Sequence, residues 1–304
     1  MRFQGSICAI VTPFSANGAP DPEAFDRLLA MHLAAGSDGI VVAGSTGESV
    51  ALEHAEADAL LAAALARLRG RMPVIAGCGA ASTHKALGLV RRARELGADA
   101  ALVVTPYYVR PTQEGLFRHY ATLADEGGLP VILYNVPGRT GCDLLPETVA
   151  RLAGRDGIAG IKEAVADPQR MQALLPLRRD GFCVLSGDDP TALRAMRAGA
   201  DGTISVAANV VPRSFARLCA LARASDGAAA QALDRELAPV YRMLGVESNP
   251  IPAKWLLYRL GLIGPGLRLP LVELSQAWRE EADHCAARIR QLEAAADPAA
   301  SRVA

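Results

Sequence analysis

One lysine of this chain lies where a lysine side chain could act as a nucleophile. The 304-residue sequence has 32 lysines and arginines together, but only three are lysines: Lys85, Lys162 and Lys254. Lys162 directly follows the apolar residues 157–161 (GIAGI). Arginine keeps its proton near neutral pH, whereas a desolvated lysine can lose it and attack a carbonyl carbon. Lys162 is therefore a Schiff-base candidate; the alternative is a lysine whose ammonium extends from a strand end to solvent.

Polar residues also follow other apolar segments of the sequence. They occupy residues 44–49 (GSTGES), 105–108 (TPYY), 134–141 (YNVPGRTG) and 186–189 (SGDD), and no comparable groups precede the segments. This asymmetry indicates an active site at one edge of a sheet. In residues 44–49, two glycines flank Ser45 and Thr46 and could leave backbone N–H groups free to hold a carboxylate. A tight turn with a helix cap is the alternative.

Two further side chains could take part in the same chemistry. Beside an imine lysine, the hydroxyl of Tyr134 could relay protons, although a lone tyrosine at this place could also be a core residue. Arg139 lies among proline and glycine, which predicts a loop. Its guanidinium could clamp a substrate carboxylate or remain solvated.

Eight apolar segments must position these residues: residues 7–11, 39–42, 73–76, 100–104, 131–134, 158–161, 183–185 and 203–206. They are continuously apolar, as parallel strands covered on both faces are. The segments between them are rich in Ala, Leu, Arg and Glu and favour helices. Eight such units in about 225 residues predict an α/β fold, a (β/α)₈ TIM barrel. An open doubly wound sheet is the alternative, since periodicity does not show closure.

Asp-Pro pairs and the end of the strand pattern predict helix starts and a boundary between two parts of the chain. Asp-Pro pairs at 21–22, 167–168 and 189–190 predict helices with aspartate as the cap and proline in the first turn. Beyond residue 225 no strand is expected, and residues 227–245, 250–261 and 272–294 are predicted helices. We therefore expect a catalytic barrel over residues 1–225 and a helical extension over residues 226–304, with residues 294–304 frayed.

Composition excludes several function classes. The formal net charge is zero and the pI is about 7.0, so a nucleic-acid or anionic-membrane surface is not indicated. No apolar run reaches the roughly 18 residues of a membrane span, and the N-terminus lacks a signal-peptide pattern. The six cysteines and five histidines are scattered, which predicts packing cysteines in a reducing cytoplasm and no metal site. Residues 77–82 (GCGAAS) approach a dinucleotide fingerprint but lack its third glycine, so NAD binding is not favoured.

The motifs at residues 44–49, 134–141 and 160–164 (GIKEA) resemble those of pyruvate-dependent class I aldolases in the N-acetylneuraminate lyase superfamily. Within it, the chain from residue 3 to 271 resembles the dihydrodipicolinate synthase branch, including TPYY, SGDD and NPIP at 249–252. This resemblance implies a lyase that condenses pyruvate with L-aspartate 4-semialdehyde to 4-hydroxy-tetrahydrodipicolinate. That reaction is the first committed step of diaminopimelate and lysine biosynthesis.

The resemblance also implies catalytic roles. Lys162 would form the imine with pyruvate, and Tyr134 would shuttle protons. Thr46 and Tyr108 would complete the proton relay, with the counterpart of Tyr108 supplied by a neighbouring subunit of a homotetramer, a dimer of dimers. The imine itself is the electron sink, so neither a metal nor an organic cofactor is expected.

Substrate-binding roles follow from the same resemblance. Ser45 and Thr46 would hold the pyruvate carboxylate, Arg139 the carboxylate of aspartate semialdehyde, and backbone near Gly187 and Ile204 would line the pocket. Arg139 favours the synthase, because related lyases of long polyhydroxy substrates generally lack an arginine there. The alternative is a paralogous aldolase or lyase acting on a 2-keto-3-deoxy sugar acid or N-acetylneuraminate. A non-catalytic barrel is a further alternative, but it would be expected to have lost Lys162 or Tyr134.

The chain departs from the family near its regulatory site. Lysine-inhibited members resemble it at Ser49, His54 and Tyr107. They carry His, Asn and Glu where this chain has Ala57, Ala81 and Lys85. A cationic inhibitor would be repelled by Lys85, so we predict weak or absent inhibition by lysine.

Overall fold

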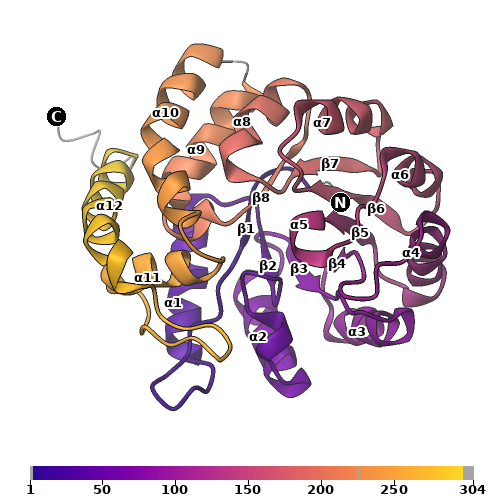
Figure 1. The fold of residues 1–304 in the computed structure, drawn as a ribbon, viewed down its shortest axis with the longest axis horizontal. Coiled ribbons are helices and arrows are strands. Elements are labelled where there is room, and N and C mark those ends of the chain that lie inside the picture. The colour runs from indigo at the N-terminus through magenta and orange to yellow at the C-terminus, as the bar shows by residue number, and fades with distance from the viewer. Residues whose placement is uncertain (1–2, 225, 297–304) are drawn as a thin grey trace.

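Eight parallel strands close into a barrel in the computed structural model, which describes residues 3–224 and 226–296 (Figure 1). Each strand pairs with the next along the chain, and β8 pairs with β1. The strands are β1 Gly5–Ala9, β2 Gly39–Val42, β3 Val74–Gly77, β4 Ala100–Val104, β5 Val131–Asn135, β6 Ile158–Glu163, β7 Cys183–Ser186 and β8 Gly202–Ser205. The predicted barrel is confirmed, and the open-sheet alternative is wrong because the sheet closes.

Helices between the strands form an outer ring around the barrel (Figure 1). They are α1 Pro22–Ala35, α2 His54–Leu68, α3 Thr83–Leu96, α4 Gln113–Gly127, α5 Pro137–Thr140, α6 Pro146–Ala153, α7 Pro168–Leu174, α8 Asp189–Arg197 and α9 Pro212–Arg223, with short 3₁₀ turns η1 Ser49–Ala51, η2 Leu175–Leu177 and η3 Ala207–Asn209. Side chains such as Ile75, Ile132 and Ile204 fill the barrel interior. The opposite faces of the strands pack against the helices. Burial on both faces explains why the strands are continuously apolar.

The predicted Asp-Pro helix starts are confirmed in position, but one predicted cap is wrong. Asp21 and Asp167 accept hydrogen bonds from backbone N–H groups in the first turns of α1 and α7. At the third pair, Asp189 turns inward and accepts from the N–H groups of Val206 (3.1 Å) and Ala207 (2.7 Å). Those donors lie just after β8, so the buried carboxylate ties the start of α8 to the end of that strand instead of capping its own helix.

The C-terminal segment is helical, as predicted. It forms α10 Gly227–Leu244, α11 Ile251–Arg259 and α12 Gln276–Ala295, which gather beside α8 and α9 at one side of the barrel (Figure 1). Of the residues expected to fray, 297–304 lie outside the described residues. None of the described helices is long and apolar enough to cross a membrane.

Candidate active site

A cavity of ≈ 330 Å³ lies where the strands end, and it brings together several of the predicted site residues. Ser45, Tyr134 and Arg139 line it, and so do Tyr107, Asn249 and Arg268. This volume is at the lower end of the range for small-molecule sites. The cavity therefore lies at the end of the barrel at which TIM-barrel enzymes carry their chemistry.

Lys162 lies beside Tyr134 on the adjacent strand. Strands β5 and β6 pair Tyr134 with Lys162, and the Nζ atom is 4.2 Å from the centre of the tyrosine ring. Lys162 is only 4% exposed and is not among the residues that line the cavity. Within the described residues, its Nζ atom has no hydrogen-bond or ion-pair partner. No carboxylate is therefore in direct contact with the amine, although burial raises the pKa of the Asp189 carboxyl and the charge of Lys162 acts at longer range to lower it.

Gly187 gives the lysine chain room. A Cβ atom at this position would be 2.8 Å from Cε of Lys162, closer than side chains pack. The Gly187 N–H donates to the carbonyl of Glu163 at 2.6 Å, which fixes this close approach. Ile204, the other predicted backbone contact, has a fully buried side chain in the barrel interior.

The loop after β2 carries the predicted carboxylate cradle. Ser45 lines the cavity, whereas Thr46 is buried and is not among the lining residues. The Oγ1 atom of Thr46 accepts a hydrogen bond of 2.9 Å from Nδ2 of Asn249. The hydroxyl proton of Thr46 is thus free to be donated elsewhere. Asn249 comes from the C-terminal segment, 203 residues away, and its side chain was not among the predicted site residues.

A buried ion pair anchors the same loop. Glu48 adopts a left-handed backbone with φ of 55°, and its Oε1 atom is 2.5 Å from Nζ of Lys254 on α11. Its Oε2 atom accepts from the backbone N–H of Arg268 (3.2 Å), whose guanidinium holds both oxygens of Glu56. Burial lowers the pKa of Lys254, and Glu48 opposes that shift. Sequence reasoning missed this pairing, although Lys254 is one of only three lysines.

Arg139 and Tyr108 differ in where the structure places them. Arg139, on α5, lines the cavity, and its Nη2 atom donates to the carbonyl of Asn249 (3.2 Å). Tyr108 is 92% exposed, has a φ of 72°, and does not line the cavity of its own chain. Its neighbour Tyr107 does. Ser45, Tyr134 and Arg139 thus line one cavity of a single chain, whereas Tyr108 does not.

The GCG segment at residues 77–79, which begins with the last residue of β3, has a packing explanation. A Cβ atom on Gly77 would lie 2.1 Å from the carbonyl oxygen of Ala43, so only glycine lets β3 approach the end of β2. Gly77 and Gly79 both line the cavity. Among the described residues, no group of three or more His, Cys, Asp or Glu side chains could hold a metal ion.

Comparisons with known proteins show which family the chain resembles over nearly its whole length. Residues 2–289 match the model of the dihydrodipicolinate synthetase family. The 4-hydroxy-tetrahydrodipicolinate synthase of Stenotrophomonas maltophilia (strain K279a) is 56% identical over 97% of this chain and 99% of the relative. The chloride-inhibited dihydrodipicolinate synthase of Acinetobacter baumannii, solved in complex with pyruvate, is 45% identical, with a TM-score of 0.92 over 94% of this chain and 99% of that one. The Thermotoga maritima dihydrodipicolinate synthase is 40% identical, with a TM-score of 0.92 over 96% of this chain and 99% of that one.

Proposed function

The chain belongs to the dihydrodipicolinate synthetase family, and we propose that Lys162 forms an imine with pyruvate to drive its reaction. The enzyme is a lyase that condenses pyruvate with L-aspartate 4-semialdehyde to give 4-hydroxy-tetrahydrodipicolinate, in the pathway to diaminopimelate and lysine. The observation that carries the proposal is the buried amine of Lys162 beside Tyr134, without a carboxylate partner among the described residues.

The imine accounts for the chemistry without a metal or an organic cofactor. Neutral Lys162 attacks the keto carbon of pyruvate, and water leaves as the C=N bond forms. The imine nitrogen then accepts the electron pair left when the pyruvate methyl group loses a proton, which gives an enamine. The enamine carbon attacks the aldehyde carbon of the second substrate, whose oxygen takes up a proton. The amino group of the product then displaces Lys162 as the ring closes.

Tyr134 is the proposed proton shuttle for these steps. Its ring lies against Lys162 and it lines the cavity, so its hydroxyl can serve both the lysine and bound substrate. Thr46 and Tyr108 are proposed to complete the relay. The hydroxyl proton of Thr46 is free because its oxygen accepts from Asn249. Tyr108 would reach the site of a neighbouring subunit.

Two carboxylate-binding regions are proposed for the two substrates. Ser45 and Thr46 would hold the pyruvate carboxylate through the loop after β2. Arg139, which also lines the cavity, would hold the carboxylate of the semialdehyde. Gly187 and Ile204 are proposed to contribute backbone to the pocket. The contact of Gly187 with Lys162 supports its part in this arrangement.

We further propose a homotetramer, a dimer of dimers, in the cytoplasm. The exposed ring of Tyr108 and its left-handed backbone support an interface role, because rare backbone conformations of this kind concentrate at functional sites. All six cysteines are buried and none of them forms a disulfide bond among the described residues, which suits a reducing compartment. Small-molecule substrates are the proposed ligands, with neither nucleic acid nor membrane as a partner.

A coupled assay tests the proposed function. Purified protein is given pyruvate and aspartate semialdehyde, and product formation is followed with the downstream reductase. Cleavage of N-acetylneuraminate and of 2-keto-3-deoxygluconate is measured in parallel. Turnover in the synthase assay alone is the expected result. Imine trapping without synthase turnover would overturn the second substrate and assign the chain to a paralogous lyase.

A further inference from the structure

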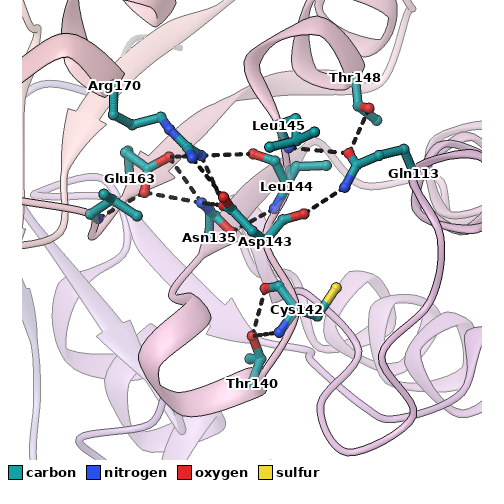
Figure 2. Close-up of polar contacts among 11 residues, drawn as sticks. Gln113, Asn135, Thr140, Cys142, Asp143, Leu144, Leu145, Thr148, Glu163 and Arg170 are labelled. Carbon is teal, nitrogen blue, oxygen red and sulfur yellow. Dashed lines mark hydrogen bonds and ion pairs between the residues drawn. The ribbon is translucent and has the colours of Figure 1, made fainter. Parts of the chain in front are cut away.

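The residues that follow Tyr134 and Lys162 are linked to each other on the outer face of the barrel. Strand pairing places Asn135 opposite Glu163, next to the pair of Tyr134 and Lys162. Side chains alternate along a strand, so these two point away from the barrel interior. Both are buried, and Nδ2 of Asn135 lies 3.1 and 3.0 Å from the two oxygens of Glu163. Figure 2 shows the amide and the carboxylate facing each other.

Asn135 also holds the segment that carries Arg139. Its Nδ2 atom donates to Oδ1 of Asp143 (2.8 Å), and its Oδ1 atom accepts from the N–H of Leu144 (2.9 Å). Residues 136–145, which include Arg139, therefore leave Asn135 and return to it. We refer to them as the Arg139 segment. One amide side chain thus closes the two ends of this segment onto β5.

Arg170 on α7 completes the closure. Its two terminal nitrogens donate to the two oxygens of Asp143 (2.8 and 2.6 Å), and Nη1 also donates to the carbonyl of Leu144 (3.2 Å) (Figure 2). The same Nη1 atom is 3.5 Å from Oε2 of Glu163. This guanidinium is mostly buried, so its bidentate pairing with Asp143 is stronger and more directional than a surface pair.

Gln113 on α4 forms hydrogen bonds with the C-terminal end of the Arg139 segment. Its Nε2 atom donates to the carbonyl of Asp143 (2.7 Å), and its Oε1 atom accepts from the N–H of Leu145 and from the hydroxyl of Thr148 (Figure 2). Both functions of this amide are therefore used on the end of the Arg139 segment. No contact in this group reaches the cavity, so its effect on the reaction must pass through the backbone that it fixes.

We infer that Asp143, held by Asn135, Arg170 and Gln113, is a positioning residue that sets Arg139 for the carboxylate of the second substrate. The inference rests on the proposed function, since it concerns the binding of aspartate semialdehyde. Loosening Asp143 should therefore affect the second substrate selectively, because the Lys162 side of the site keeps its own contacts.

The test is a double-mutant cycle between Asp143→Asn and Arg139→Ala in the full-length enzyme. Asp143→Asn replaces one acceptor oxygen by an NH₂ group, which would face an N–H donor of Arg170 or Asn135. This donor–donor contact would loosen the hold on the Arg139 segment. Asp143→Asn should raise the KM for aspartate semialdehyde by about tenfold or more. The half-saturation for pyruvate and borohydride trapping on Lys162 should stay at wild-type values. In the Arg139→Ala background, the added loss of kcat/KM should nearly vanish.

Asp125→Asn is the matched control, because it makes the same chemical change in an exposed Asp–Arg pair with Arg155. It should leave both KM values unchanged. Gln113→Ala provides a second variant if Asp143→Asn does not fold, and it should show the same selective loss. Additive losses in the cycle, or equal losses toward both substrates, would overturn the inference alone. Absence of synthase turnover in the wild-type protein would overturn the proposed function and the inference with it.

Discussion

Two buried lysines of this chain occupy nearly the same physical setting and differ in one partner. Lys162 and Lys254 are 4% and 0% exposed, and each Nζ atom lies 4.2 Å from the centre of an aromatic ring, Tyr134 or Phe14. Lys254 has Glu48 at 2.5 Å, whereas Lys162 has no ion-pair partner among the described residues. A carboxylate holds an ammonium in its charged form, and an aromatic ring alone does so weakly.

The difference separates a structural lysine from a reactive one. Lys254 ties α11 to the loop after β2, and its charge is needed for that contact. Lys162 makes no ion pair among the described residues, so imine formation there would break none. Burial alone thus does not identify a nucleophile. The better candidate is a buried lysine that makes no ion pair and lies beside a tyrosine that can move protons.

The largest expected effect comes from Lys162→Met. This change keeps the length of the side chain and removes the amine, so turnover should fall by more than about 10³-fold and pyruvate trapping should disappear. Stability should be equal or higher, because a buried amine without a partner is replaced by an apolar chain. Steady-state kinetics and denaturant unfolding measure the two outcomes. Substantial residual turnover would break the comparison.

The same substitution at the other lysine should give the reverse pattern. Lys254→Met leaves Glu48 buried without its partner and should cost about 3–5 kcal/mol of stability. Trapping on Lys162 should persist in the folded fraction. The double variant Glu48→Gln/Lys254→Met should recover much of the lost stability, because it removes both charges. An unchanged unfolding free energy in Lys254→Met would show that the ion pair is not structural.

Two histidines extend the comparison to buried bases without a carboxylate. Burial lowers the pKa of His32 and of His119 to about 4. Their unfolded pKa is near 6.5, so the unfolded chain binds more protons between these values, and stability falls as pH decreases through that window. Each histidine should lower the free energy of unfolding by about 2 kcal/mol between pH 7 and pH 5. Glu163, whose pKa burial raises to about 6, opposes this by about 1 kcal/mol.

Unfolding in denaturant at pH 7 and at pH 5 checks the prediction. His32→Gln should reduce the loss of stability between the two pH values by about 2 kcal/mol relative to the wild-type protein. His54, which is exposed, provides the control: His54→Gln should leave the loss unchanged. An equal pH dependence in wild type and His32→Gln would contradict the assignment of the acid loss to this buried ring.

The third lysine gives the smallest expected effect. Lys85 is exposed in the first turn of α3, and on the family resemblance described above it replaces an acid of lysine-inhibited members, so it should repel a cationic inhibitor. Sub-millimolar lysine should leave the initial rate nearly unchanged. Lys85→Glu should increase sensitivity only slightly, because Ala57 and Ala81 still lack the polar side chains. Strong inhibition of the wild-type enzyme at this concentration would contradict the prediction.

The barrel was predictable because its signal is local. Continuously apolar segments such as 100–104 indicate strands covered on both faces, and the topology then brings residues at successive strand ends to one site. This logic placed Ser45, Tyr134 and Arg139 at the cavity. Contacts between distant parts of the chain carried no comparable signal. The pairing of Glu48 with Lys254 spans 206 residues, and the bond between Thr46 and Asn249 spans 203.

The direction of individual side chains was the second feature that could not be predicted from the sequence. Asp189 was expected to cap its helix because Asp-Pro is a local cap signal. Its carboxylate turns instead to the backbone beyond β8, a choice set by donors that only the folded barrel brings near. The same reason hid the closure of the Arg139 segment. The role of Asn135 depends on contacts that only the folded chain makes. Its side chain on β5 meets Glu163 on β6 and the end of the Arg139 segment on the outer face of the barrel.

Borohydride trapping with pyruvate, followed by peptide mass mapping of the wild-type protein, is the direct test of whether Lys162 is the lysine that forms the imine. All three lysines are present in one sample, so each is an internal control for the others. We expect a single reduced pyruvate adduct, on the peptide that contains Lys162, and unmodified Lys254 and Lys85. An adduct on Lys254, or pyruvate-dependent turnover with no adduct on Lys162, would contradict it.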